Sequence, residues 1–237
     1  MDRCWSFWID RGGTFTDVIG RTDEGAETSL KLPSASPAYE DAAVEAMRRL
    51  LGAAPGEAFP AHRVRAIKMG TTVATNALLE RRGAKTLFVT TRGFADALVI
   101  GDQARPDLFA LHIERPAPLY AGVIEAPERL AADGAVVTPL DRMALESQLR
   151  TALGEGYDAV AVAFLHSDLN PAHEAAAGEI ARELGFPFVA LSHEVSPLPR
   201  FLPRAETTVA DAYLTPVLQA YVRQVAGAVA GAPLFFM

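Results

Sequence analysis

Two β-rich runs separated by a pair of glycines open the chain and constrain its fold. Residues 5–9 (Trp-Ser-Phe-Trp-Ile) lead into residues 10–17 (Asp-Arg-Gly-Gly-Thr-Phe-Thr-Asp), and residues 18–20 extend the second run. Paired glycines between such runs favour a tight turn, because glycine adopts positive φ without a clash from a Cβ atom. The pattern therefore predicts a β-hairpin whose turn leaves backbone N–H groups free to bind an anion.

The polar side chains around this turn suit a bound phosphate. Asp10 is a hard oxygen ligand of the kind that holds a hydrated Mg²⁺ beside a polyphosphate. Thr14 and Thr16 lie two residues apart and are expected to share a face, whereas Asp17 falls on the opposite face unless a bulge intervenes. The alternative interpretation is an ordinary glycine hairpin with polar residues at its tip.

The composition argues against several classes of protein. The 237 residues, 50% of them hydrophobic, are enough to bury one substantial core, or one domain and part of another. A net charge of -7, with no basic run longer than two residues, argues against a nucleic-acid or anionic-membrane partner. The longest apolar run, residues 159–165, is far shorter than the ~20 residues that span a bilayer, and the first residues do not resemble a signal peptide. We therefore expect a cytoplasmic protein, whose single cysteine, Cys4, is a packed thiol.

The order of the predicted elements indicates an α/β fold. An antiparallel start of three strands is followed by α/β alternation. The predicted elements after the hairpin are a strand at 28–32, a helix at 37–51, a strand at 64–69, a helix at 71–82, a strand at 86–90, a helix at 141–153, a strand at 159–165, a helix at 171–184, a strand at 187–191, a helix at 207–231 and the start of a strand at 233–237. Residues 92–141 are rich in proline and turn signals, with a hairpin pattern at 131–134, and are interpreted as an elaboration near the site. Because the last residues form an apolar strand with no turn after it, we expect the chain to be cut within a larger protein.

A second group of candidate ligand-binding residues begins where the strand at 64–69 ends. Gly70 is followed by Thr71 and Thr72, which enter a helix whose free N–H groups are expected to attract an anion. One threonine is explained as an N-cap that needs no ligand. The other is expected to face a ligand together with Asn76, since asparagine is a mediocre helix former. Arg92 follows the next strand, at the carboxyl end where open α/β sheets bind ligands.

Together these motifs resemble a known family over essentially the whole chain. The matching segments are residues 10–17, 70–81, 105–109 (Arg-Pro-Asp-Leu-Phe), 164–167 (Phe-Leu-His-Ser), 170–174 (Asn-Pro-Ala-His-Glu) and 192–197 (Ser-His-Glu-Val-Ser-Pro). They are similar to the N-terminal region of the A-type subunits of the ATP-dependent hydantoinase and 5-oxoprolinase family. The resemblance implies the ribonuclease-H-like α/β fold of the actin, Hsp70 and sugar-kinase class. It also divides the chain into an N-terminal domain at residues 1–198 and the start of a following domain at 199–237, truncated before a second lobe.

The resemblance also implies an activity and roles for the candidate residues. The implied reaction is the ATP-dependent opening of a cyclic amide, 5-oxoproline or a hydantoin, after phosphorylation of the amide oxygen. The catalytic candidates are Asp10 and Asp17, with Asp10 organising Mg²⁺; the phosphate-binding candidates are Gly12, Gly13, Thr14 and Thr16; the substrate-binding candidates are Thr71, Thr72, Asn76, Arg92, His166 and Glu194. A B-type subunit or a fused C-terminal domain is the implied partner, in an enzyme expected to be oligomeric.

The histidines are each interpreted with a structural alternative. His166, His193 and Glu194 follow predicted strands and are placed to approach a ligand, whereas His173 lies at a helix start and is interpreted as a capping or surface residue. No close histidine pair indicates zinc, so Mg²⁺ is the only metal expected.

Two alternative functions stay open. Subunits of ATP-dependent carboxylases of acetone-like ketones look similar over these same motifs, and a truncated lobe that binds nothing tightly is a non-catalytic alternative. Phe201, Leu202 and Asp211 depart from the more polar family pattern, which leaves the identity of the substrate open.

Overall fold

The structure is a computed structural model that describes residues 4–54, 56–102, 109, 111–112 and 116–237. Residues 105–108 of the motif at 105–109 lie outside these ranges. The chain forms two compact units, one from Met1–Glu80 and Val217–Met237 and the other from Arg81–Pro216. The chain passes from one unit to the other after Glu80 and after Pro216, and neither position coincides with the domain boundary expected at residue 198. That boundary remains a prediction.

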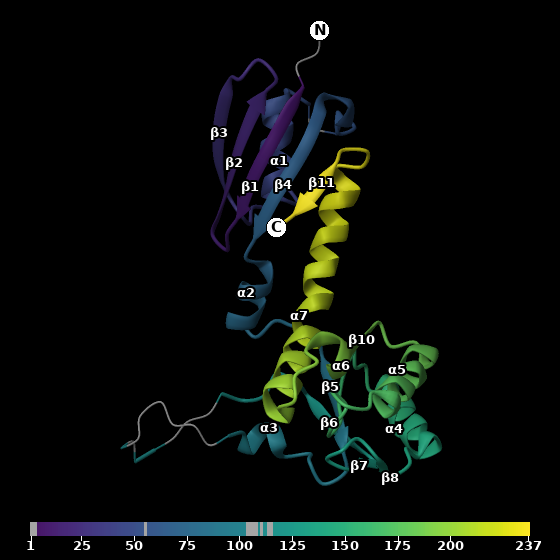
Figure 1. The fold of residues 1–237 in the computed structure, drawn as a ribbon. Helices are drawn as coiled ribbons and strands as arrows, with labels where there is room; N and C mark the ends of the chain where they lie inside the picture. Colours follow the sequence, from purple (N-terminus) through teal and green to yellow (C-terminus); the bar gives the residue numbers. More distant parts are fainter. Residues whose placement is uncertain (1–3, 55, 103–108, 110, 113–115) are drawn as a thin grey trace. The chain divides into compact units, whose positions relative to one another are not determined.

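The first unit is built on a five-stranded sheet (Figure 1). Its strand order is β11-β4-β1-β2-β3, and its strands are β1 (Trp5–Arg11), β2 (Phe15–Thr22), β3 (Glu27–Pro33), β4 (Val64–Thr71) and β11 (Leu234–Phe236). β1 to β3 form the antiparallel meander predicted from the sequence, while β4 runs parallel to β1 and β11 runs parallel to β4. The central strand β1 is therefore paired along its length on both sides.

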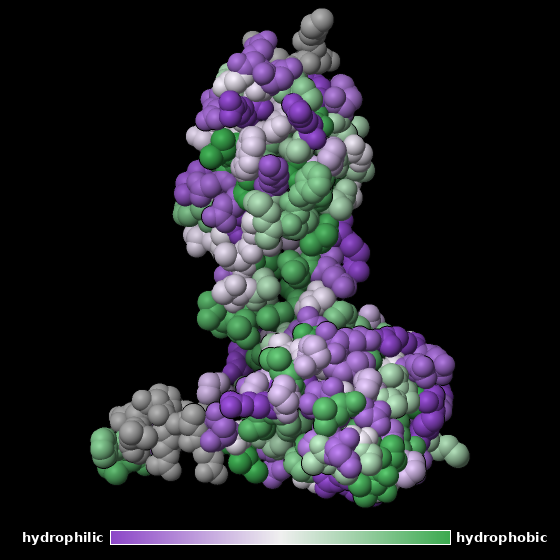
Figure 2. All heavy atoms as spheres, in the orientation of Figure 1, coloured by the Kyte–Doolittle hydropathy of each residue, from purple (hydrophilic) through white to green (hydrophobic). Residues whose placement is uncertain are grey.

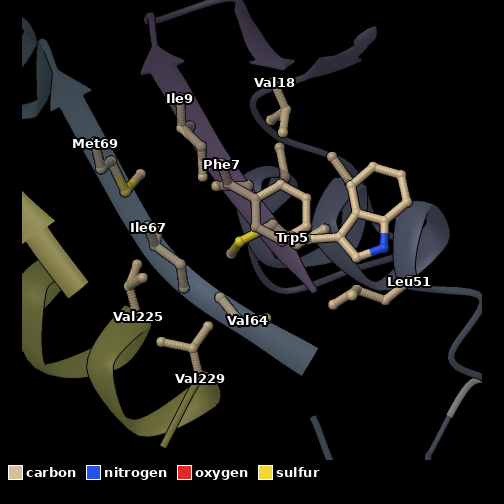
Figure 3. Close-up of a cluster of buried hydrophobic side chains, with 14 of the residues drawn as sticks. Trp5, Phe7, Ile9, Val18, Leu51, Val64, Ile67, Met69, Val225 and Val229 are labelled. Atoms are coloured by element: carbon tan, nitrogen blue, oxygen red, sulfur yellow. The ribbon is translucent and has the colours of Figure 1, made fainter. Parts of the chain in front are cut away.

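One face of this sheet is buried because apolar and polar residues alternate along its strands. Figure 3 shows Phe7 and Ile9 of β1 in one cluster with Ile67 of β4, Val225 of α7 (Phe201–Ala228) and Val229, which lies just after that helix. The helix α1 (Ala42–Leu51) covers the same core. The opposite face exposes mixed side chains, and the surface of the unit in Figure 2 accordingly mixes hydrophobic and hydrophilic groups.

Helix α1 begins later than its sequence pattern predicts because an aspartate caps it. The carboxylate of Asp41 accepts hydrogen bonds from the amides of Ala43 and Val44, and the helix ends at Gly52, whose φ is 68°. The shorter helices of this unit are η1 (Ala61–Arg63) and α2 (Val73–Leu79).

The second unit contains a four-stranded, fully parallel sheet in the order β10-β9-β5-β6. Its elements are β5 (Thr86–Thr91), α3 (Ala97–Ile100), β6 (Gly122–Ala126), the small hairpin β7 (Arg129–Leu130) and β8 (Val136–Thr138), α4 (Arg142–Gly154), β9 (Ala159–Ala163), α5 (Ala172–Leu184), β10 (Phe188–Leu191), α6 (Ser192–Val195) and the first part of α7. The predicted turn at 131–134 is confirmed as the connection of the β7–β8 hairpin.

Both faces of the two central strands, β5 and β9, are buried; β9 is entirely apolar, whereas β5 also buries three threonines. Val160 and Val162 pack with α4 and α5, whereas the intervening alanines pack with Ala205 and Val209 of α7. Consecutive strand residues point to opposite faces, so the unit has three layers. Among the described residues no helix has the length and apolar character required to cross a membrane.

The strand order reverses between β5 and β9. The chain passes from β5 to its neighbour β6, and then returns to the other side of β5 to form β9 and β10. In open α/β sheets, ligands bind outside the carboxyl ends of the strands at such a switch point. The residues that follow β5 and β9 are therefore candidates for ligand contact.

Candidate functional site

The turn between β1 and β2 presents two free backbone donors. The Gly12 amide closes the turn by donating to the Phe15 carbonyl oxygen at 3.1 Å. Within the described part of the chain, the amides of Gly13 and Thr14 donate to no other group. Adjacent amides of this kind form a concave site for an anion.

The two glycines are required for a reason that differs from the sequence prediction. Neither Gly12 nor Gly13 has a positive φ. Instead, a Cβ atom on Gly12 would lie 2.9 Å from the Phe15 oxygen, and one on Gly13 would lie 2.8 Å from Asn76 Nδ2. Close approach, not turn handedness, therefore selects glycine at both positions.

The second motif lies directly against this turn, a contact that the sequence did not predict. The amide and the hydroxyl of Thr72 both donate to the Arg11 carbonyl oxygen, at 3.0 and 3.2 Å. Asn76 Nδ2 donates to Thr72 Oγ1 at 3.2 Å while its side chain packs on Gly13. The structure thus brings the hairpin and α2 together within one unit.

The start of α2 offers less to an anion than its sequence suggested. Thr71 Oγ1 accepts from the Val73 amide at 3.2 Å, so one amide is already satisfied. The helix is also only seven residues long, which limits its dipole. The hairpin turn, which packs on Asn76 through Gly13, adds the amides of Gly13 and Thr14, for which the described residues offer no partner.

The two threonines of the hairpin do not share a face, so that expectation is wrong. Thr14 lies in the turn before β2 begins and is exposed, whereas Thr16 is fully buried and hydrogen-bonds Ser34 Oγ at 2.9 Å. Ser34 in turn donates to the Gly12 carbonyl oxygen at 2.7 Å and, through its amide, to Thr14 O at 2.8 Å. Ser34, which sequence reasoning missed, therefore supports the turn from the core side, with Thr16 behind it.

A row of charged side chains crosses the exposed face of the sheet. The strand register pairs Asp10 with Asp17, and Asp17 with Lys31. Lys31 Nζ donates to both Asp17 oxygens, at 2.9 and 2.8 Å. The exposed Asp10 carboxylate has no hydrogen-bond or ion-pair partner among the described residues.

The free Asp10 carboxylate fits a hydrated Mg²⁺. This ion keeps several water ligands and is often held by only one or two carboxylates beside phosphate. The described residues contain no group of three side chains suited to enclose a metal. Asp10 beside the free turn amides therefore suits an ion that arrives with a phosphate.

Arg11 belongs to the buried side of the hairpin. Its guanidinium lies 4.6 Å above the Tyr221 ring, and its Nε is 3.7 Å from Asp41 Oδ2. Burial raises the pKa of the Tyr221 hydroxyl, as does the nearby Asp41 charge, while Arg11 opposes this shift. The side chain of Arg11 is thus engaged in holding α1 and α7 on the sheet.

The remaining candidates lie in the second unit. Arg92 is exposed directly after β5, and His166 lies after β9 in a turn where its φ is 57°. The Leu165 amide donates to Thr91 Oγ1 at 3.0 Å and so joins the ends of these two strands. Arg92 and His166 therefore both lie at the switch point, whereas Glu194, exposed on α6, lies 3.8 Å from Arg182 in an ion pair.

A buried charge network, missed by sequence reasoning, underlies these strand ends. Glu174 and Arg204 have no exposed side-chain surface, and Arg204 Nη1 lies 3.5 Å from Glu174 Oε1. Arg204 Nη1 donates to the hydroxyls of Ser167 and Ser192, and its Nη2 donates to the Phe164 carbonyl oxygen at 3.0 Å. Burial lowers the pKa of Arg204, partly offset by the charges of Glu174 and Asp168. The sequence signal that could have revealed this network is Arg204, a single arginine beside the apolar residues at the start of the last long helix.

The interpretation of His173 as a capping or surface residue is wrong. Its ring is buried, and Nδ1 lies 2.7 Å from Oε2 of the buried Glu128. The other oxygen of Glu128 accepts from the Thr91 hydroxyl. This pair therefore links α5 to the end of β5.

Comparisons with known proteins agree with this architecture. The family model described as the hydantoinase/oxoprolinase N-terminal region matches residues 6–185. The 5-oxoprolinase of Saccharomyces cerevisiae is 41% identical over 254 residues, which cover 92% of this chain and 20% of that protein. The acetophenone carboxylase gamma subunit of Aromatoleum aromaticum is 35% identical over 238 residues, which cover 92% of this chain and 32% of that protein. The chain thus spans a fifth to a third of the length of these relatives.

The crystal structure of an ATP-dependent caprolactamase from Pseudomonas jessenii is similar throughout. It superimposes with a TM-score of 0.78 at 31% identity, covering 98% of this chain and 35% of that one. The expected α/β fold of the actin, Hsp70 and sugar-kinase class is confirmed.

Proposed function

The chain belongs to the hydantoinase/oxoprolinase family, and on that premise we propose that it is the phosphate-holding part of an ATP-dependent enzyme that opens a cyclic amide, 5-oxoproline or a hydantoin. The observation that carries this proposal is the association of the β1–β2 turn with α2. It gathers in one unit Asn76, the amides of Gly13 and Thr14 and the Asp10 carboxylate, and the last three groups have no partner among the described residues.

The chemistry follows from the inertness of an unstrained amide. Transfer of the γ-phosphoryl group of ATP to the amide oxygen breaks the bond to ADP and makes the carbonyl carbon an imidate-like electrophile. Water then adds to that carbon, the ring C–N bond breaks, and a second water releases phosphate to leave a carboxylate and an amine. Catalysis of the phosphoryl transfer consists mainly of positioning and charge neutralisation.

The proposal assigns each part of the hairpin a task. The amides of Gly13 and Thr14 and the Thr14 hydroxyl bind phosphate oxygens, and Asp10 holds Mg²⁺ through water. Bound Mg²⁺ would neutralise phosphate charge. Thr16 acts from behind the turn through Ser34, and Asp17 contributes a charge beside Asp10 that Lys31 balances.

The substrate-binding candidates are proposed for each unit by itself. Thr72 and Asn76 shape the phosphate side, with Thr71 fixing the start of α2. Arg92 and His166, at the switch point, and Glu194, at the end of β10, are proposed to contact the cyclic amide. The implied partner is a B-type subunit or a fused C-terminal region, in an oligomeric enzyme.

A subunit of an ATP-dependent ketone carboxylase is the second candidate. Its support is the 35% identity to the acetophenone carboxylase gamma subunit across 92% of the chain. Phosphorylation of the substrate would use the same hairpin, so the two candidates differ in the substrate and in the step that follows, which is ring opening by water in one case and carboxylation in the other.

Phosphate release from ATP distinguishes these functions. The assay uses an enzyme that carries this chain with its B-type subunit or fused C-terminal region, and compares 5-oxoproline, hydantoin and acetone plus bicarbonate as stimulants. Stimulation by a cyclic amide with a ring-opened product supports the hydrolase. Stimulation by the ketone and bicarbonate alone transfers the protein to the carboxylases, and a failure of all three contradicts both proposals.

A further inference from the structure

The carboxylate of Glu174 is saturated with hydrogen-bond donors. Its Oε1 accepts from the Phe164 amide at 2.7 Å and from the Ser192 hydroxyl at 2.6 Å. Its Oε2 accepts from the His193 amide at 3.0 Å and faces His193 Nδ1 at 2.7 Å. A carboxylate has about four acceptor positions, two on each oxygen, and all are used here.

These bonds keep Glu174 ionised. Burial alone would raise the pKa of this carboxyl, but hydrogen bonds from His193, Ser192 and the Phe164 amide outweigh burial and hold the pKa below its ordinary value. Arg204 adds a positive charge 3.5 Å from Oε1. An ionised carboxylate only accepts hydrogen bonds, so His193 Nδ1 must be the donor.

This requirement determines the state of the histidine ring. In a neutral imidazole only one nitrogen carries a proton. With that proton on Nδ1, the lone pair of His193 lies on Nε2, the nitrogen that acts as a base. The buried carboxylate therefore selects one of the two tautomers.

The Nε2 side of the ring faces the outside of the unit. The side chain of His193 is 17% exposed, and Nε2 lies 4.0 Å from Oε1 of the exposed Glu194. Glu194 also lies 3.8 Å from Arg182. The helix α6 begins directly after β10, and His193 is its second residue. It therefore lies near the carboxyl end of a parallel strand, the edge at which α/β sheets bind their ligands.

We propose that His193 is a catalytic residue of the ring-opening step and that Glu174 is the positioning residue that fixes its tautomer. Nε2 takes the proton of the water whose oxygen bonds to the phosphorylated amide carbon. It then gives that proton to the ring nitrogen as the C–N bond breaks. This role rests on the proposed function, but the tautomer does not.

The second carboxylate–histidine pair provides a matched control. Glu128 Oε2 lies 2.7 Å from His173 Nδ1, the same pairing in another part of the unit. The control variant Glu128→Gln removes that carboxylate and leaves the Glu174–His193 pair in place.

The tautomer is tested in the full chain by ¹⁵N NMR of the histidine rings, with His193 assigned through His193→Gln. In the wild type, at a pH where the ring carries one proton, Nδ1 is expected to give the signal of a protonated nitrogen and Nε2 that of an unprotonated one. Glu174→Gln is expected to mix the two tautomers, whereas Glu128→Gln leaves the His193 signals unchanged. A wild-type ring protonated on Nε2 and bare on Nδ1 overturns the assignment, whether or not the variants fold.

The catalytic role is tested in the enzyme that carries this chain and its partner region. His193→Gln is expected to lower kcat for ring opening by about 100-fold or more, with an unchanged KM for ATP. Glu174→Gln lowers kcat less, and Glu128→Gln keeps the wild-type kcat. An unchanged kcat in His193→Gln overturns the role of His193 while leaving the proposed function intact, whereas a wild-type enzyme that opens no cyclic amide contradicts the proposed function itself.

Discussion

Gly13 lies so close to Asn76 that a Cβ atom on the glycine would sit 2.8 Å from the Asn76 amide nitrogen. This approach joins two motifs that are about 60 residues apart in the sequence and places a side-chain amide beside the free N–H groups of the turn. The relationship is directly testable.

Gly13→Ala is expected to displace Asn76 and to lower the free energy of unfolding by about 1–3 kcal/mol, the usual cost of overpacking. Asn76→Ala in the same chain is expected to recover part of this loss, because it removes the clashing amide. Chemical denaturation measures both. Gly227→Ala is the control, since a Cβ there meets nothing within 4 Å; equal losses in the single and double variants would contradict the contact.

Asp10→Ala is expected to abolish ATP turnover in the complete enzyme without a loss of fold, because its exposed carboxylate has no partner among the described residues. Phosphate release and the thermal unfolding midpoint measure the two effects. Asp23→Ala, in the exposed turn after β2, is the control. Normal ATP turnover in Asp10→Ala would contradict the proposal that the β1–β2 hairpin binds the metal ion and the phosphate.

Lys31→Met is expected to strengthen the binding of divalent cations to the chain. The change frees Asp17 next to Asp10 and leaves two unbalanced carboxylates on one row of the sheet. Titration calorimetry with Mn²⁺ measures the affinity. The stability should change by less than about 1 kcal/mol, since the ion pair is exposed. Asp17→Asn is the comparison variant, because it removes the carboxylate that Lys31→Met frees. An unchanged cation affinity in Lys31→Met would show that the charged row of Asp10, Asp17 and Lys31 does not face the ion.

Glu174→Gln is expected to lower the free energy of unfolding by about 1–3 kcal/mol, because it removes one of the two carboxylates, Glu174 and Asp168, that face the buried Arg204. The pKa of Glu174 in the folded chain lies below the ordinary value of 4.5. Its stabilising contribution is therefore complete above that value and is lost as the pH falls through the lower, folded-state pKa.

Denaturant unfolding over the acidic range measures this dependence. The wild type should lose stability more steeply below pH 4.5 than Glu174→Gln does. Parallel curves for the two proteins would show that Glu174 does not change its pKa on folding. The double variant Glu174→Leu with Arg204→Met tests whether apolar packing replaces the pair.

The strands of the first unit are predictable from local sequence. Alternation in residues 5–22 specifies β1 and β2, because an extended chain with one buried face must alternate. The helix boundaries were less predictable where a capping residue decides them, as Asp41 does for α1. Asn76 stood out in the sequence because asparagine is a mediocre helix former, whereas Thr72 could not be told from an ordinary N-cap.

Other parts of the site depend on contacts that no local pattern encodes. Ser34 reaches Gly12 only because β2 and β3 bring them together, and Arg204 meets Glu174 across 30 positions of sequence. The role of Gly13 likewise depends on a neighbour from α2. The division into two units follows contacts between distant segments, because residues 217–237 return to the first sheet.

The central position of β1 limits which changes in length the chain tolerates. Every residue from Trp5 to Arg11 is matched to a partner on both β2 and β4. One residue inserted here would point the side chain of Asp10 into the core and that of Ile9 toward solvent, since a slip of one position reverses the faces of a strand. Variants that gain or lose a residue should therefore fold when the change lies at the exposed turn around Gly25, where even an added Cβ would meet nothing within 4 Å, and fail to fold when it lies within β1.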